Sequence, residues 1–156
     1  PKAHIYHTAA EILEQVGGDI DGFCSGVGTG GTISGIGEVL KKQNPSIKIW
    51  AVEPENAAIL SGGSVGTHLQ MGIGDGLIPD NLNTTIYEHI CVISDDEAIK
   101  TAKRLASEEG IMCGISSGSN VAAAIKLARR LGKGKTVVTV LPDTGERYFS
   151  TELFDD

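Results

Sequence analysis

The sequence predicts an open α/β fold in which a mostly parallel sheet is covered by helices on both faces, in three layers. The first reason is that short apolar runs alternate with amphipathic helical patterns along the 156 residues. The second is that glycine-rich or serine-rich segments follow or bracket several of the apolar runs. Such alternation builds βαβ units, whose strands are parallel. Because no internal repeat or low-complexity tract interrupts it, we expect one α/β domain over residues 1–156.

The first half of the chain reads as a helix followed by one βαβ unit. Residues 8–16 place apolar side chains at helical spacing, and a Gly-Gly pair at 17–18 ends the segment. The unit over residues 19–54 then consists of a strand at 20–24, a helix at 32–42 and a strand at 47–52. We expect the two strands to pair in parallel.

The second half continues the alternation after a long glycine-rich stretch. Residues 61–79 show little periodicity and are too long for an ordinary connection, which predicts a loop that lines a site. Ser94 is a predicted helix N-cap, since acidic residues fill the first turn after it and Gly110 stops the helix. The remaining predicted elements are strands at 90–93 and 136–141, the latter fully buried, and a helix at 120–131.

Composition limits the classes of function. A hydrophobic content of 40% and a charged content of 21% are ordinary for a soluble globular domain. The net charge of -7, with basic residues gathered only at 126–135, disfavours nucleic acid. Three widely spaced cysteines favour neither disulfides nor a zinc site, so we expect a reducing, cytoplasmic compartment. No apolar run approaches the ~20 residues of a membrane span, and the absence of an initiator Met leads us to expect a longer parent protein.

The glycine-rich stretch at 25–35 is the strongest candidate for binding a ligand. It joins the strand at 20–24 to the next helix, and its glycines let an anion approach the main chain at a helix N-terminus. Thr29 and Thr32 add hydroxyl donors. The alternative is a tight turn without a ligand, but this many glycines in a plain turn would waste conformational entropy. We therefore expect a phosphate here.

Three segments follow or bracket predicted strands, namely 26–32, 72–76 and 116–119. Ligands in open α/β sheets bind at the carboxyl ends of strands, so these segments are expected to line one crevice. A dinucleotide site is an alternative, because Gly26, Gly28 and Gly31 satisfy its fingerprint and Glu53 ends the second strand where a ribose-binding acid belongs. Spacing alone does not reject it.

Other chemistry has little support in the sequence. His4 and His7 lie near one terminus, His68 and His89 stand alone, and no Cys or acidic partner lies at ligand spacing. We expect solvated or packed histidines and no metal site. No G-x-S-x-G motif occurs, which disfavours a serine hydrolase.

Several runs carry a family resemblance when they are taken in order. They are GVGTGGTISG at 26–35, VEP at 52–54, ILSGG at 59–63, MGIG at 71–74, EGIMCGISSG at 109–118 and GERYFST at 145–151. Together they resemble cysteine synthase, the O-acetylserine sulfhydrylase family of fold-type II pyridoxal phosphate enzymes. The resemblance covers this whole chain but only the C-terminal half of the family enzyme. The Schiff-base lysine belongs to the other half, so we expect no catalytic lysine and no activity in this chain alone.

The resemblance implies a role for particular residues. The cofactor phosphate would be held by Gly28, Thr29, Gly30, Gly31 and Thr32. Ser116 would face the pyridine nitrogen of pyridoxal 5'-phosphate, although Ser116 or Ser117 as a plain helix N-cap is the alternative. Gly72 and Gly74 would belong to an active-site wall that shifts when substrate closes the cleft, unless they form an ordinary turn. Asp75 and Asp143 depart from the family pattern or stand where it varies, which leaves the acyl donor open.

The reaction implied is a β-replacement in which O-acetylserine and sulfide give L-cysteine. The implied assembly is a cytoplasmic homodimer that includes the missing N-terminal half of the enzyme. Sister enzymes that make cystathionine share most of these motifs, although residues 72–76 resemble the synthase more closely. A nucleotide-binding module with a structural or regulatory role is the alternative from another class.

Overall fold

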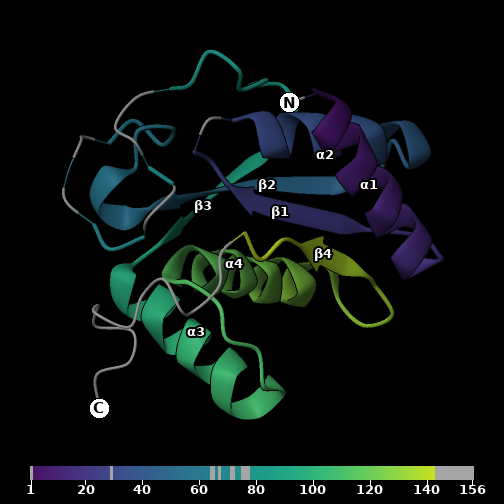
Figure 1. The fold of residues 1–156 in the computed structure, drawn as a ribbon. Coiled ribbons are helices and arrows are strands. Elements are labelled where there is room, and N and C mark those ends of the chain that lie inside the picture. The colour runs from purple at the N-terminus through teal and green to yellow at the C-terminus, as the bar shows by residue number, and fades with distance from the viewer. Residues whose placement is uncertain are drawn as a thin grey trace.

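A computed structural model describes residues 2–28, 30–63, 66, 68–70, 73–74 and 78–142, with only the backbone described for residues 2–5. A four-stranded sheet in the order β3-β2-β1-β4 forms its centre (Figure 1). All three strand pairs are parallel. The strands are β1 (Gly22–Gly26), β2 (Lys48–Pro54), β3 (His89–Ile93) and β4 (Val137–Thr139).

Helices cover both faces of this sheet, which confirms the predicted three-layer α/β fold (Figure 1). On one face lie α1 (Lys2–Val16) and α2 (Gly31–Gln43), and on the other lie α3 (Asp95–Glu109) and α4 (Ile115–Leu131). A short 3-10 helix, η1 (Glu55–Ala57), follows β2. Within the described part of the chain, no helix is long and apolar enough to cross a membrane.

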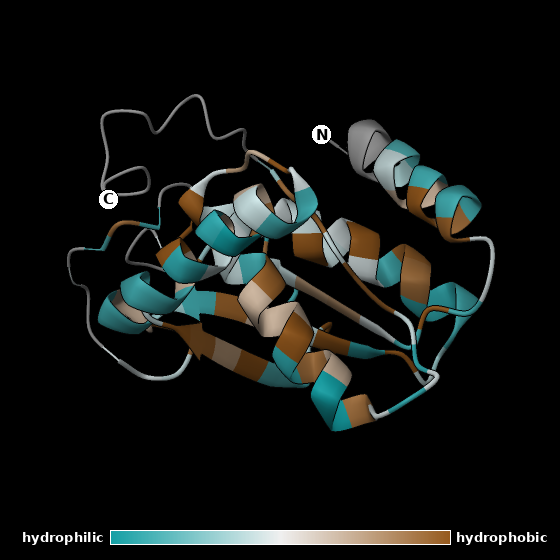
Figure 2. Ribbon diagram, turned by 90° about the horizontal axis from the view of Figure 1, so that it is seen from below, coloured by the Kyte–Doolittle hydropathy of each residue, from teal (hydrophilic) through white to brown (hydrophobic). Residues whose placement is uncertain are grey.

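Each face of the sheet has its own apolar core, because successive strand residues point to opposite faces. In β1, Phe23 faces α1 and α2 whereas Cys24 faces α3 and α4, and both side chains are fully buried. Figure 2 shows that each helix carries both hydrophobic and hydrophilic residues, as a helix with one face on a sheet requires. The largest fully buried apolar side chains of the two cores are Phe23, Ile33, Ile36, Leu40, Ile49, Val52, Ile93, Ile115 and Leu127.

Local capping signals place most element ends within a residue or two of the prediction. Ser94 is the N-cap of α3, and its Oγ accepts a hydrogen bond from the Glu97 amide at 3.2 Å. Gly110 ends the same helix with a positive φ of 68°. Both ends agree with the sequence, because the cap residues act through short-range bonds.

Three predicted elements are wrong in extent. Helix α1 begins at Lys2 rather than at residue 8. Helix α4 begins at Ile115 rather than at residue 120, and Gly118 lies inside it. A Cβ at Gly118 would collide with the Ala98 carbonyl oxygen, so this glycine permits the close approach of α3 and α4 rather than a turn. The last strand was expected to be buried over 136–141, but β4 is only Val137–Thr139 and half-buried, because within the described residues it pairs with β1 alone.

Candidate cofactor-binding site

The sheet has a topological switch point between β1 and β4. The chain leaves β1 toward α2 on one face, whereas α4, which leads into β4, lies on the opposite face (Figure 1). At such a point the connections diverge and leave a crevice at the carboxyl ends of the two strands. The N-termini of α2 and α4 both lie at this end of the sheet.

The glycine-rich loop begins at the carboxyl end of β1 and ends in the first turn of α2. Gly30 is the N-cap of α2, with a φ of 84° and no capping side chain. A Cβ at Gly30 would lie 2.8 Å from the Leu82 backbone nitrogen, so glycine is required for both conformation and space. The helix start also carries no acidic residue. These features suit an external anion.

The predicted phosphate ligands lie in this loop. Gly28 is half-buried, Gly30 is buried and Thr32 is exposed, while Gly31 opens the helix. Thr29 lies outside the described residues. Their role as phosphate ligands stays a prediction.

Ser116 is buried in the first turn of α4, where it is 1% exposed. Its Oγ is a buried side-chain atom without a hydrogen-bond partner in the described structure. A buried hydroxyl left unpaired costs about 1–3 kcal/mol, so such an atom needs an explanation. A ring nitrogen of a bound cofactor would supply the missing acceptor. The orphaned hydroxyl therefore fits pyridoxal phosphate at this crevice.

The alternative of Ser116 or Ser117 as a helix N-cap is wrong. The N-cap is Gly114, in extended conformation with φ -79° and ψ 175°. Both serines lie within the helix and are buried. Helix capping therefore does not account for the Ser116 hydroxyl.

Gln70 ties the second glycine-rich segment to the helices around Ser116. The side chain is 0% exposed, and its Nε2 donates to the Ile93 carbonyl at 2.8 Å and to Asp95 Oδ1 at 2.9 Å. Its Oε1 accepts from Ser119 Oγ at 2.7 Å. Since Ser119 lies one turn beyond Ser116 on α4, this segment is fixed against the helix that carries the orphaned hydroxyl.

Gly74 lies beside the glycine loop. Its amide donates to the Val27 carbonyl at 3.1 Å, and its φ is 67°. A Cβ there would lie 2.6 Å from Pro54 Cγ, so the backbone packs closely against the end of β2. A Cβ at Gly26 would likewise lie 2.6 Å from Ile73 Cγ2, so Ile73 packs closely against Gly26. The structure thus brings Gly74 next to the glycine loop, whereas Gly72 lies outside the described residues.

Glu53 is buried at the end of β2 and has a structural role. Its Oε1 accepts from the Leu60 amide at 2.8 Å, and its Oε2 accepts from the Ser61 amide at 2.9 Å and from Ser61 Oγ at 2.6 Å. These bonds fold the turn that follows η1. Because the carboxylate is already occupied, the dinucleotide alternative loses its ribose-binding acid.

Two buried polar residues near the crevice, Gln70 and Asn120, were not predicted from the sequence, whereas the buried Ser119 belongs to the predicted segment 116–119. Asn120 Oδ1 accepts from the Gly26 amide at 2.8 Å, and its Nδ2 donates to the Val140 carbonyl at 2.9 Å. The available signal was a Ser-Asn pair at the start of an otherwise alanine-rich helix. That signal says nothing about which distant backbone groups the side chains meet.

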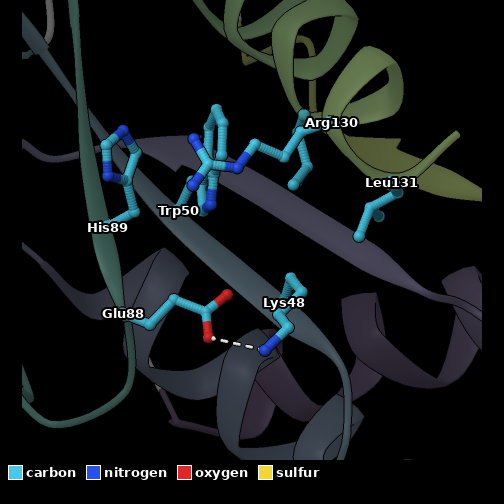
Figure 3. Close-up of a pocket in the computed structure, with 7 residues that line it drawn as sticks. Lys48, Trp50, Glu88, His89, Arg130 and Leu131 are labelled. Atoms are coloured by element: carbon cyan, nitrogen blue, oxygen red, sulfur yellow. Dashed lines mark hydrogen bonds and ion pairs between the residues drawn. The ribbon is translucent and has the colours of Figure 1, made fainter.

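A cavity of about 350 Å³ lies at the opposite, amino-terminal end of the sheet (Figure 3). Lys48 and His89 begin β2 and β3, and the rings of Trp50 and His89 lie 4.4 Å apart between their centroids. The lining residues are Lys48, Trp50, Glu88, His89, Leu127, Arg130 and Leu131. None of them belongs to the predicted site. Across the described residues, no group of three or more His, Cys, Asp or Glu side chains is arranged to hold a metal ion.

Comparisons with known proteins agree with the family resemblance found in the sequence. The chain is 55% identical over 159 aligned residues to a cysteine synthase of Staphylococcus aureus (strain Mu50), which covers all of this chain and 51% of that protein. A cysteine synthase structure from Entamoeba histolytica superposes with a TM-score of 0.94 at 42% identity, over 99% of this chain and 46% of that one. The chain therefore spans about half the length of the curated relatives it matches.

A sister activity also occurs among the similar structures. An O-acetylserine dependent cystathionine β-synthase from Helicobacter pylori superposes with a TM-score of 0.93 at 37% identity, over 99% of this chain and 50% of that one. The family described as "Pyridoxal-phosphate dependent enzyme" matches residues 3–143. On this evidence, with the glycine loop and the buried Ser116 at one crevice, the chain belongs to the pyridoxal-phosphate dependent enzymes.

Proposed function

We propose that this chain is the cofactor-binding α/β domain of a cysteine synthase that makes L-cysteine from O-acetylserine and sulfide. The observation that carries the proposal is the buried Ser116 hydroxyl, which lacks a partner in the described structure and lies at the start of α4. The relative from Staphylococcus aureus, at 55% identity, supports the choice of reaction within the family. When bound, pyridoxal 5'-phosphate supplies the electron sink for β-replacement.

The glycine loop binds the cofactor phosphate. The ligands are the backbone amides and hydroxyls of Gly28, Thr29, Gly30, Gly31 and Thr32. The start of α2 carries partial positive charge and has no capping side chain or acidic residue to compete with an anion. The proposal therefore uses the helix terminus as the anchor for the phosphate.

Ser116 sets the electronic character of the cofactor ring. A neutral hydroxyl donates a hydrogen bond to an unprotonated nitrogen, but unlike a carboxylate it does not hold that nitrogen protonated by charge pairing. The electron sink is then moderate. By holding the nitrogen with a neutral hydroxyl, Ser116 would favour the β-replacement over side reactions such as transamination or racemisation.

Gly72 and Gly74 form the wall of the substrate cleft in this proposal. Support comes from Gly74, whose amide bonds to Val27 at the start of the phosphate loop. Gln70, which precedes the wall, is held by its bonds to the Ile93 carbonyl and Ser119, and Gly74 packs on Pro54. Closure there would exclude water from the reacting groups.

The lysine that binds the cofactor covalently comes from a part of the enzyme outside this chain. Several lysines of the described part lie on the surface in ion pairs, including Lys48 with Glu88 and Lys100 with Asp96. None lies in a motif that matches the family's lysine motif. We propose that the complete enzyme is a cytoplasmic homodimer.

A cystathionine-forming reaction is the second candidate. It is favoured by the structural match to the Helicobacter pylori enzyme, whose name gives the same O-acetylserine donor. The two candidates differ only in the nucleophile. Product analysis with sulfide or homocysteine as the acceptor separates them.

The test of the proposal is Ser116→Asp in the full-length enzyme, with Ser116→Thr as a control that keeps the hydroxyl. We expect Asp to protonate the cofactor nitrogen, shift the absorbance of the bound cofactor and depress cysteine formation, while Thr retains the wild-type spectrum. Circular dichroism checks that the variants are folded. Unchanged absorbance and unchanged cysteine formation in folded Ser116→Asp would remove Ser116 from the site.

A further inference from the structure

The ladder between β1 and β4 stops before the two strands reach the crevice. It pairs Gly22 with Val137, Phe23 with Val138 and Cys24 with Thr139, and goes no further. Two residues after Cys24, the side chain of Asn120 stands between the strands instead. Its Oδ1 accepts from the Gly26 amide at 2.8 Å, and its Nδ2 donates to the Val140 carbonyl at 2.9 Å.

We propose that Asn120 is a positioning residue for the phosphate loop. Its side-chain amide replaces the next rung of the β1–β4 ladder and so holds the first residue of the loop at a fixed distance from α4. Asparagine suits this place because its side chain, like a peptide group, offers both a donor and an acceptor. The inference rests on the proposed function, since it assumes that the cofactor phosphate binds at residues 28–32.

The inserted side chain also explains how the crevice stays open. A direct rung would bring the strands to the usual spacing of about 4.8 Å and close the gap between their ends. With Asn120 in place, both backbone groups are satisfied although the strands do not pair. Asn120 is 2% exposed, so neither group would readily find water in its place.

Gly26 is shaped to receive this contact. A Cβ at Gly26 would lie 2.6 Å from Ile73 Cγ2 and 3.2 Å from Asn120 Oδ1, so a larger residue would push the amide away. Thr139 Oγ1 donates to the Cys24 carbonyl at 2.7 Å and secures the last true rung below it. The strand end is therefore held in place up to Gly26, where the glycine loop begins.

Helix α4 carries both the proposed partner of the cofactor nitrogen and the residue proposed to position the phosphate loop. Ser116 lies in the first turn of α4, and Asn120 lies one turn later. The helix itself is held independently of Asn120, by the bond of Ser119 to Gln70 and by the packing of Gly118 on α3. Removing the Asn120 side chain should therefore release the loop without displacing Ser116.

The experiment compares full-length Asn120→Ala and Asn120→Asp with a control, Asn44→Ala. Asn44 also bridges backbone groups, since its Nδ2 donates to the Ile20 carbonyl at 3.1 Å and its Oδ1 accepts from the Ser46 amide at 3.1 Å, but it lies at the other end of α2. The measurements are the Kd of the apoenzyme for pyridoxal 5'-phosphate, the ³¹P chemical shift of the bound phosphate and the Tm.

Asn120→Ala is expected to raise the Kd about tenfold, as loss of buried hydrogen bonds at the loop implies, and to move the ³¹P resonance. Asn120→Asp keeps the acceptor for Gly26 but loses the donor to Val140, so we expect a smaller rise. Asn44→Ala should lower the Tm while the Kd and the ³¹P shift stay as in the wild type. If Asn120→Ala does not fold, Asn120→Asp decides by the same readouts.

Two outcomes would overturn the inference, and they are distinguishable. A lower Tm in the Asn120 variants with unchanged Kd and ³¹P shift would make Asn120 a structural residue only. A wild-type enzyme that does not bind pyridoxal 5'-phosphate would instead refute the proposed function, and the inference with it.

Discussion

The two ends of the parallel sheet use polar residues in opposite ways. At the carboxyl end, Ser116, Gln70 and Asn120 are buried, and their polar atoms either bridge separate elements or lack a partner. At the amino end, Lys48 and Glu88 are among the residues that line a cavity of about 350 Å³ (Figure 3), and their side chains are 51% and 41% exposed. Burying a polar group costs free energy unless the group is hydrogen-bonded. Buried polar groups therefore indicate a binding site more reliably than a surface cavity does.

The same contrast applies to the charged groups at the two ends. Glu53, near the carboxyl end, is 2% exposed and accepts from three donors. Glu88, near the amino end, makes one ion pair with Lys48 at 3.4 Å. Exposed pairs contribute little to stability, whereas breaking a buried network leaves unpaired donors. Substitutions at the carboxyl end should therefore change the free energy of unfolding more than substitutions at the amino end.

The largest expected effect is that of Glu53→Ala. The change leaves the Leu60 and Ser61 amides and the Ser61 hydroxyl without an acceptor, and we expect a loss of about 3 kcal/mol in the free energy of unfolding. Urea unfolding of the full-length protein measures it. A loss below about 1 kcal/mol would show that the turn after η1 finds water or another acceptor.

Gln70→Met should have the next largest effect, about 2 kcal/mol, because a side chain of similar size loses the bonds to Ser119, Asp95 and the Ile93 carbonyl. Ser119 keeps its bond to the Ile115 carbonyl and Asp95 keeps its bond from the Leu69 amide, so the effect stays below that of Glu53→Ala. Ser119→Ala removes only one of these bonds and should cost less. The two changes share a bond of 2.7 Å, so in a double-mutant cycle their effects should not add. Additive effects would mean that the bond does not couple residues 68–70 to α4.

Much of the fold was predictable because it depends on short-range signals. Ser94 and Gly110 fix the ends of α3 by bonds to neighbouring residues, and the glycine loop precedes α2 as expected. The start of α4 was missed because Gly118 and its neighbours look like a turn. Their helical conformation depends on packing against Ala98 in another helix.

Site residues were predictable only where they lie in a recognisable sequence motif. Ser116 was identified from its motif, and its burial without a partner was not visible in the sequence. The roles of Gln70 and Asn120 were missed because they depend on partners 49 and 94 residues away. Such pairings follow from the sheet order β3-β2-β1-β4, which the sequence alone does not specify.

Cys24 lies in β1, between the two ends of the sheet. We expect its thiol to give the free energy of unfolding a pH dependence of intermediate size. Burial raises the pKa of its thiol from 9.0 to about 12. Between these values the unfolded chain loses a proton that the folded chain keeps, so stability falls as the pH rises. From pH 9 to 10 this loss is about 1 kcal/mol.

Urea unfolding of wild type and Cys24→Ala at both pH values measures this loss. The variant should lose less stability over the interval, although it is less stable at both pH values because of the cavity left in the core. Burial also raises the pKa of Cys91 and of Cys113, so a smaller slope is expected to remain. Equal slopes in wild type and variant would show that Cys24 ionises as readily in the folded protein as in the unfolded chain.

The smallest expected effect is that of Glu88→Gln at the amino end. Within the described part of the chain, the ion-pair partner of this carboxylate is Lys48, both side chains are exposed, and such pairs contribute about 0.5 kcal/mol or less. We therefore expect a change in the free energy of unfolding within that limit, and no change in the Kd for pyridoxal 5'-phosphate. None of the hydrogen bonds and ion pairs given above joins a residue around the cavity to the crevice at the carboxyl end. A marked rise in that Kd would therefore contradict the comparison, because it would show that the amino end of the sheet influences cofactor binding.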